Sequence, residues 1–517
     1  MKGPAPRVFG RALVALPVVL CSLAVVPVLA DDPWVARISV LDGAAVVKRA
    51  DGGDTTAAIV NAPLMVGDYV TTQDSTRAEI EFDASDVLRM SSDTQLRFSE
   101  LDAQGRTIQL ATGTVELRVL ADGDNYPAIQ TPSVTVRPNK AGAYRVSVLD
   151  DGSAQVTVRL GEADLNDGTD DQTADPGNTV GVVTSDAGVQ FQTLPTIAVD
   201  DFDSWNADRD RVAQATQSYQ YVDSSVVGAD DLDLYGQWVS VPGYGEVWSP
   251  NVAAGWAPYT VGRWVWEPYY GWTWVAAEPW GWAPYHYGRW FHDSAVGWCW
   301  YPERVHAVWR PALVAFFSFG AGDGGGVSVG FGNIGWVPLG PREQFHPWWG
   351  GVTYVSNATY RNFNAPGGAV WVSQRRFAMG DFSHPTAVSR ADLANVSVVR
   401  GTLPVVPTEH NLDFGGRPAA VVTTSDRFSR FSAPVQHVPT FAEERESVRA
   451  QTVHTITAPN ETQPHDAWSR FSNDAPRPQG DANTYRPQPW YRAVPRAAGQ
   501  PSRRTSSHKR PAKVPNS

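Results

Sequence analysis

The sequence predicts a mainly β protein, and three observations lead to this fold class. Its 517 residues include 21 Trp, 45 Gly and 39 Pro, which are weak helix formers. Short runs of alternating apolar and polar residues fill the N-terminal part, as in half-buried strands. A tryptophan-rich segment then repeats with a period of 26 residues. We therefore expect an N-terminal β-sandwich or β-roll, one linker helix, stacked β-hairpin repeats and a disordered C-terminal tail.

Residues 1–30 have the composition of a signal peptide. Lys2, Arg7 and Arg11 form a basic start, a long apolar run follows, and Ala30 ends a small-residue cleavage site. The apolar run also nears the length of a bilayer span, so an uncleaved anchor is the alternative. Cleavage after Ala30 predicts a periplasmic or secreted protein without a stable membrane span.

Residues 35–199 should form an all-β domain. Runs such as Ala78–Phe82 and Gln155–Leu160 alternate apolar and polar side chains, and Asp150–Gly152 before the second run is a hairpin signal. Residues 31–200 carry 27 acidic against 12 basic side chains. Nucleic acid is therefore not an expected partner, because this surface would repel phosphates.

The same region resembles the periplasmic FecR domain family. The motifs that carry the resemblance follow one another in order: Val66–Asp68, Thr71-Thr72, Val87–Met90 with Ser91, Gly113–Val115, Thr131-Pro132, Tyr144–Val148 and Val158–Gly161. The sequence departs from the family at Ala141–Ala143, where Gly followed by Thr is usual. The resemblance implies the fold and a binding or sensing role in the periplasm. FecR-type signalling proteins carry a transmembrane helix before this domain, and only a signal-like segment precedes it here, so sigma-factor control is not carried over.

Residues 200–235 should link the two β regions through one helix. The stretch from Asp203 to Val227 contains neither Gly nor Pro, which predicts a helix of about 12–18 residues. We expect Asp203 or Ser204 to cap its start. Trp205 and Val212 should pack on a neighbouring sheet.

Residues 236–345 form the expected repeat domain. Gly236, Gly262 and Gly288 begin three units, and each glycine is followed two residues later by Trp. Each unit reads as a strand, a Pro/Tyr/Gly turn and a second strand, with alternate tryptophans on one face. Residues 236–302 hold 12 of the 21 tryptophans. One unit is too short to bury its own indoles, so neighbouring units should stack.

Two interpretations of these indoles remain open. In the first, they form the core of the stacked array. In the second, some of them form an exposed shelf for sugar rings, with arginine and histidine side chains beside it as hydrogen-bond donors. The residues proposed for this binding site are Trp256, Arg263, Trp264, Trp272, Trp282, His286, Arg289 and Trp290.

The repeat region also resembles a secreted bacterial family of unknown function, DUF6600, which pairs a FecR domain with tryptophan- and proline-rich repeats. The resemblance is carried by Asp231–Gly236, the three repeat units, Trp300–Pro302, Trp309–Ala312 and Gly335–Gly340. It implies this domain arrangement, and it implies no activity.

Strings that are typical of enzymes or metal sites fail their structural tests. Gly326–Gly330 matches a nucleophile elbow around Ser328, and Gly320–Gly325 matches a dinucleotide loop, but no helix is expected after either. Glu162–Gly168 matches a calcium loop only in part. The ten histidines are scattered, and Cys299 reads as a small buried apolar residue. We expect no cofactor, no metal site and no enzymatic activity.

Three segments follow the repeats. Residues 346–400 should be a β-rich extension with strands at Val352–Val355 and Ala369–Val372. Residues 401–458 show weak patterning, and residues 459–517 should be a disordered basic tail rich in Pro and Arg.

These features favour a non-enzymatic secreted or periplasmic envelope protein. It would bind a cell-wall polysaccharide, peptidoglycan or a protein partner through the FecR-like and tryptophan-rich domains. The alternative is a periplasmic FecR-type sensor that relays a signal by protein contact.

Overall fold

The computed structural model describes residues 3, 34–53, 55–102, 105–123, 125–185, 188–303, 308–319, 332–349, 353–415, 419–432, 435–450 and 453–455. These residues belong to one compact unit that ends at Thr457. The expected signal peptide, the string around Ser328 and the expected tail at 459–517 lie outside them. In this described part, no helix is long and apolar enough to cross a membrane.

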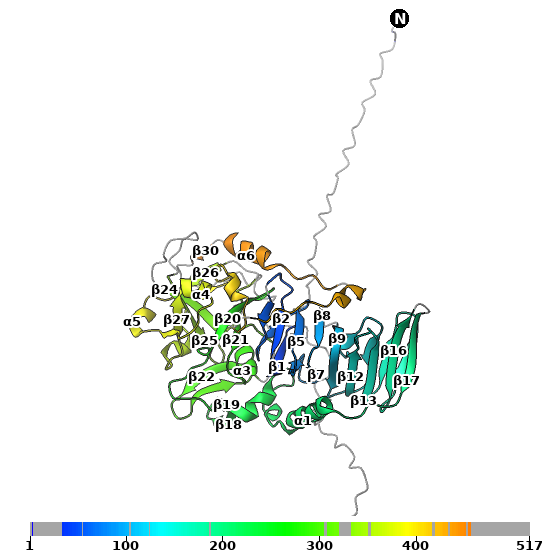
Figure 1. Ribbon diagram of the computed structural model, residues 1–517. Helices are drawn as coiled ribbons and strands as arrows, with labels where there is room; N and C mark the ends of the chain where they lie inside the picture. Colours follow the sequence, from blue (N-terminus) through cyan, green and yellow to red (C-terminus); the bar gives the residue numbers. More distant parts are fainter. Residues whose placement is uncertain are drawn as a thin grey trace, which may run out of the picture. The chain divides into compact units, whose positions relative to one another are not determined.

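The N-terminal region is an all-β domain of two sheets, as predicted (Figure 1). Sheet A contains, in order, β4 (Pro63–Leu64), β1 (Ala36–Asp42), β6 (Arg77–Glu81), β7 (Asp86–Met90), β9 (Arg106–Val119), β12 (Gly142–Val148), β13 (Ala154–Leu160), β16 (Thr179–Ser185) and β17 (Gly188–Leu194). Sheet B contains β3 (Thr55–Ala57), β2 (Ala45–Lys48), β5 (Tyr69–Thr72), β8 (Gln95–Leu101), β9, β10 (Ala128–Gln130), β11 (Thr135–Pro138), β14 (Ala163–Asn166) and β15 (Asp171–Ala174). Only the β9–β10 pair is parallel among these pairings.

One long strand joins the two sheets. The first half of β9 pairs with β8 and β10 in sheet B, and the half after Gly113 pairs with β7 and β12 in sheet A. Alternate side chains such as Ile80, Leu88 and Leu117 are fully buried in a common core. The predicted hairpin at Asp150–Gly152 connects β12 to β13.

A single helix covers part of the outer face of sheet A. Helix α1 (Asp201–Ala215) has the predicted length, but its N-cap is Asp200, which forms a capping box with Asp203. The helix therefore begins before the expected cap at Asp203 or Ser204. Trp205 is half-buried with Arg77 near its ring, whereas Val212 is 38% exposed and does not pack as expected. Charged residues dock this helix, and Val212 lies outside that contact.

Short turns lead from α1 to the tryptophan hairpins: η1 (Ser218–Gln220), η2 (Ala229–Asp231) and α2 (Leu232–Tyr235). The three repeats then form the predicted hairpins, β18–β19 (Gly236–Val241, Gly245–Pro250), β20–β21 (Gly262–Glu267, Gly271–Ala276) and β22–β23 (Arg289–Asp293, Gly297–Tyr301). The first and third hairpins join through Trp248 and Trp300 into one four-stranded sheet, while the second stands as a separate pair. The second Trp-Ala-Pro-Tyr connection forms the short helix α3 (Trp282–His286).

A seven-stranded sheet crosses the domain boundaries that the sequence suggested. Its order is β28 (Thr386–Ala387), β27 (Val370–Ser373), β25 (Asn333–Pro338), β24 (Val314–Phe319), β29 (Ser397–Arg400), β26 (Thr353–Ser356) and β30 (Val453–Thr455). The short helices η3 (Arg361–Asn364), α4 (Gln374–Ala378) and α5 (Arg390–Leu393) lie between these strands in the chain. The expected extension at 346–400 therefore completes a sheet that begins inside the expected repeat domain.

The segment between β29 and β30 returns to the N-terminal domain. It contains η4 (Glu409–Asn411), η5 (Asp426–Arg430) and α6 (Phe441–Ala450), which Figure 1 shows in yellow and orange. Ser425 donates its backbone N–H to Gln95 on β8, and the Phe428 ring packs edge-on against Tyr69 on β5. Much of the segment expected to be weakly ordered is thus ordered against sheet B.

Candidate functional site

The structure brings most of the predicted binding residues together, but in the interior. Trp264, Trp272, Trp282 and Trp290 are each at most 1% exposed and belong to one large aromatic core. Their rings meet mainly edge to face, as in the Trp264–Trp274 pair with centroids 5.3 Å apart. A sugar ring needs an exposed indole face to stack on, and these four indoles offer none. The first interpretation, indoles as core, describes them.

The predicted polar residues of the shelf are held by internal contacts. The His286 ring is buried, with Nδ1 2.7 Å from the backbone oxygen of Arg310, and burial lowers the pKa of this imidazole to about 3. Arg289 donates to the backbone oxygen of Gly288 and forms an ion pair with Glu303 at 3.4 Å. These two side chains stabilise the repeat domain from within.

Trp256 and Arg263 remain partly exposed. The Trp256 indole donates to Glu278, and its ring packs at the margin of the aromatic core. Arg263 precedes Trp264 on β20, so strand alternation turns it to the opposite face of the hairpin. The structure therefore separates the only two predicted site residues that reach the surface.

The β20–β21 hairpin is the wall between two hydrophobic cores. Trp264 and Trp274 face the aromatic core, whereas Val265 and Val275 are fully buried in the core of the FecR-like sheets. Arg263 shares the second face with these valines. The 26-residue repeat alone does not predict that the β20–β21 hairpin lies between two cores, because the period carries no information about which part of the chain packs against the second face of the hairpin.

A cleft of about 1100 Å³ opens beside this wall. Its walls are mostly small apolar residues from β2, β3 and the ends of β20 and β21, and its polar groups include Gln73, Arg263, Asp381, Ser383 and His384. The volume suits a small organic ligand or a short peptide. No sequence pattern other than Arg263 pointed to this cleft, because its lining comes from four distant parts of the chain.

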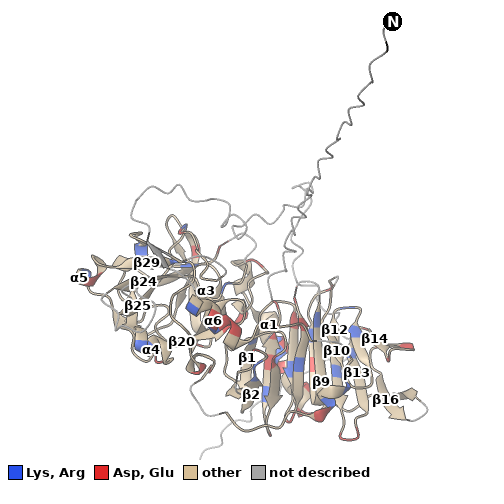
Figure 2. Cartoon of the chain, turned by 90° about the horizontal axis from the view of Figure 1, so that it is seen from above, with Lys and Arg blue, Asp and Glu red and all other residues tan. Residues whose placement is uncertain are grey.

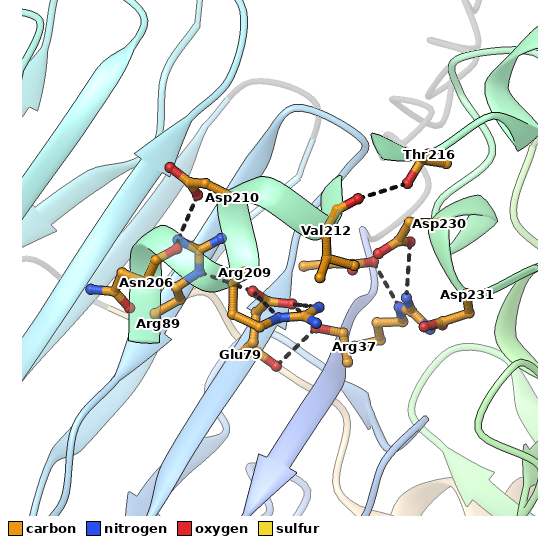
Figure 3. Close-up of polar contacts among 12 residues, drawn as sticks. Arg37, Glu79, Arg89, Asn206, Arg209, Asp210, Val212, Thr216, Asp230 and Asp231 are labelled. Carbon is orange, nitrogen blue, oxygen red and sulfur yellow. Dashed lines mark hydrogen bonds and ion pairs between the residues drawn. The ribbon is translucent and has the colours of Figure 1, made fainter. Parts of the chain in front are cut away.

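A buried ionic cluster lies where α1 and η2 cover sheet A (Figure 3). Arg37 on β1 contacts Glu81 and Asp231 at 2.8 Å each and Asp230 at 3.6 Å. Arg89 on β7 contacts the Glu79 carboxylate at 2.9 Å. Arg89 also reaches Asp210 of α1 at 2.7 Å, and Arg209 of α1 contacts Glu79 at 2.8 Å. Ion pairs thus hold this part of the helix against sheet A, in addition to the buried side chain of Phe202 near its start.

The carboxyl groups of this cluster differ in pKa although they share one face. Burial raises the pKa of Glu81 to about 8 and that of Asp231 to about 7, against the opposing charge of Arg37. Burial also acts on Glu79, but Arg209 and Arg89 outweigh it and hold the pKa of Glu79 at about 2. Glu79 forms ion pairs with two guanidinium groups, whereas three carboxyl groups share the single guanidinium group of Arg37.

One edge of sheet A differs from the other sheet edges of this domain. β17 is seven residues long, carries no charge, and has no described strand on its free side. Edge β15 has four residues and includes Asp171, and edge β3 is contacted by Asp413 through Thr56. In Figure 2, strand β16, which pairs with β17, is tan, whereas acidic residues appear in red beside β14 of the other sheet. Val189 and Phe191 on β17 are only half-buried at the end of the core.

No group of three or more His, Cys, Asp or Glu suited to a metal ion occurs within the described ranges. The partial calcium motif at Glu162–Gly168 falls in the β14–β15 hairpin, where Asp167 accepts backbone hydrogen bonds from Thr169 and Asp170. Cys299 is buried on β23, as predicted, and burial raises the pKa of its thiol to about 12. Its thiol is accordingly protonated at neutral pH.

Comparison with known proteins supports both resemblances. The model of the FecR protein family matches residues 68–164, and the model of a family of unknown function, DUF6600, matches residues 229–343. Two crystal structures of a protein proposed to be an anti-sigma factor from Parabacteroides distasonis ATCC 8503 are similar, at 15% and 16% identity and a TM-score of 0.23. Each alignment covers 25% of this chain and 60% of the other, so the chain spans less than two thirds of those proteins. No curated protein matches the sequence.

Proposed function

Because the chain carries a FecR domain followed by a DUF6600 region, we propose that it is a non-enzymatic protein of the cell envelope that relays a signal by binding a protein partner. Its location would be the periplasm or the extracellular space, in keeping with the composition of residues 1–30. The observation that carries this proposal is the unpaired edge of β17.

Exposed sheet edges normally carry charges, bulges or covering segments, because free backbone groups invite another strand. β17 has none of these within the described chain, and Val183 on neighbouring β16 is 46% exposed. An extended segment of a partner could pair with β17 and cover Val189 and Phe191 at the same time. We therefore place the partner contact at this edge.

Glycan binding through the repeat tryptophans has less support. It was based on indoles that face water, and six of the eight proposed residues are buried. The aromatic repeats instead form a core that holds the second hairpin against the FecR domain. Protein contact is the function that these observations favour.

The test uses a photo-crosslinking amino acid at Thr193, which is exposed on β17, in cells that produce the full chain. We expect an adduct with a specific envelope protein, and Gln190→Lys should lower its yield about fivefold, or about 1 kcal/mol. Thr173→Lys on edge β15 is the matched control and should leave the yield unchanged. Cross-links only to a second copy of the chain would show that the β17 edge mediates self-association, and would contradict the proposed binding of another envelope protein. No adduct at all would contradict the proposal.

A further inference from the structure

Two arginines occupy the same position in successive repeats. Arg263 and Arg289 lie 26 residues apart, each between the first Gly and Trp of its unit. Their strand registers also agree, because Arg263 lies opposite Val275 and Arg289 lies opposite Tyr301. The two side chains therefore begin from equivalent backbone sites.

Their partners differ. Arg289 has its carboxylate, Glu303, two residues beyond the register partner Tyr301. The equivalent position in the preceding repeat is Ala277. The second repeat has thus kept the cation and lacks the internal anion that neutralises it in the third repeat.

Arg263 has no carboxylate partner among the residues that the structure describes. Its Nη2 donates to the backbone oxygen of Gly380 at 3.1 Å, its Nε is buried without a hydrogen-bond partner, and it forms no ion pair with a described residue. Burial lowers the pKa of this guanidinium, with only the charge of Asp413 opposing. An arginine nevertheless stays protonated at neutral pH, so the site holds a positive charge that no described carboxylate pairs with directly.

The other acidic groups near the cleft are already engaged. Asp381 accepts two hydrogen bonds from Arg376, at 2.8 and 3.1 Å, and Asp413 accepts from Thr56 at 2.8 Å. His384, at the same rim, is exposed. The rest of the lining is mainly Ala, Val, Ile and Phe side chains, including Val261, which is 44% exposed.

We propose that this cleft binds a carboxylate ligand with an apolar body, and that the ligand carboxylate pairs with Arg263 as Glu303 pairs with Arg289. The third repeat has the carboxylate of Glu303 where the second repeat has Ala277, so we infer that the charged end of the ligand is a carboxylate. The Ala- and Val-lined walls identify its body. This site is independent of the β17 edge, so either can fail without the other.

Calorimetric titration of the full chain at neutral pH tests the proposal with two probes, decanoate and tetra-alanine. The first has a hydrocarbon body and the second a peptide body, so they distinguish the two sources of such a carboxylate. At least one should bind, and decanol or tetra-alanine amide should bind at least about tenfold more weakly, which is about 1.4 kcal/mol. Arg263→Met should reduce binding of the same probe by a similar factor.

Substitution of Ala277, which is equivalent to Glu303 of the third repeat, gives the sharper test. Ala277→Glu supplies an internal carboxylate and should weaken binding at least about tenfold, while Ala277→Gln fills similar space without charge and should weaken it less than about threefold. Both changes are at an exposed residue, so the fold should persist, which far-UV circular dichroism checks. Binding of neither probe, binding that survives Arg263→Met, or equal losses for the two substitutions at Ala277 would overturn the proposal.

Discussion

Glu79 and Glu81 show how neighbouring residues on one strand face acquire opposite electrostatic roles. Both side chains are on β6 and both are buried beneath the cover of sheet A. Glu79 forms ion pairs with both Arg89 and Arg209. Glu81 pairs with Arg37, which Asp230 and Asp231 also contact. The number of guanidinium groups per carboxylate, and not burial alone, decides which glutamate is ionised at neutral pH.

This difference predicts a pH dependence of stability with a defined sign. Burial raises the pKa of Glu81 from about 4.5 to about 8, so the unfolded chain releases this proton more easily. The free energy of unfolding should therefore fall as pH rises from about 5 to 8, by an amount on the order of a few kcal/mol for this residue. Glu81→Gln removes the titration and should flatten the slope in urea denaturation curves.

The control lies two residues away. The pKa of Glu79 is lowered to about 2, so its contribution is complete above about pH 4.5 and is lost only as pH falls toward 2. Glu79→Gln should lower the free energy of unfolding by about 3–5 kcal/mol throughout pH 5–8, because the buried guanidinium of Arg89 and the half-buried guanidinium of Arg209 lose a partner. A slope in Glu81→Gln equal to that of the wild type would contradict this assignment.

At the scale of elements, the bend of β9 lets one strand serve both sheets. Gly113 sits at the bend with φ of +88°, and a Cβ there would lie 2.4 Å from Thr94 Oγ1 and 2.5 Å from Thr94 Cα. Gly113→Ala should lower the free energy of unfolding by about 2–4 kcal/mol, from backbone strain and overpacking together. Denaturant unfolding of the full chain measures this change.

Gly123 provides the comparison for this substitution. A Cβ at Gly123 would meet nothing within 4 Å, so Gly123→Ala should change the free energy of unfolding by less than about 0.5 kcal/mol. If Gly113→Ala and Gly123→Ala lowered the free energy of unfolding by equally small amounts, Thr94 could move away from the new Cβ at position 113 without loss of sheet pairing in the second half of β9. That result would remove Gly113 as the determinant of the bend.

Sequence patterns within a single segment predicted the elements whose formation depends on that segment alone. The three hairpins, helix α1 and the β12–β13 turn follow from period, absence of Gly and Pro, and turn chemistry. The joining of the first and third hairpins depends on which edges meet in space, which no local pattern contains. The sequence predicted Arg263 beside aromatic residues, whereas the structure places it on the opposite face of β20, where the neighbouring FecR-like core is distant in sequence.

At the scale of the whole molecule, the FecR-like domain and the aromatic repeats share buried contacts. Arg49 on β2 contacts Glu267 on β20 at 2.7 Å, and both side chains are almost fully buried. The backbone oxygen of Trp266 accepts from the same guanidinium, and Glu444 of α6 accepts from the Trp266 indole. Unfolding either region would expose charges that the other neutralises, so calorimetry of residues 34–457 should show one cooperative transition.

Arg49→Met tests this coupling. It leaves Glu267 buried without a counter-ion and should lower the free energy of unfolding by about 3–5 kcal/mol at pH 9. Burial already raises the pKa of Glu267 to about 8 against the charge of Arg49, so at pH 6 the orphaned carboxyl stays protonated and the loss should be smaller. Arg211→Met breaks an exposed pair with Asp208 and should cost less than about 0.5 kcal/mol at either pH. Two separate transitions in the wild type, or equal effects of the two arginine substitutions, would show that the regions fold independently and that the cleft between them has no fixed shape.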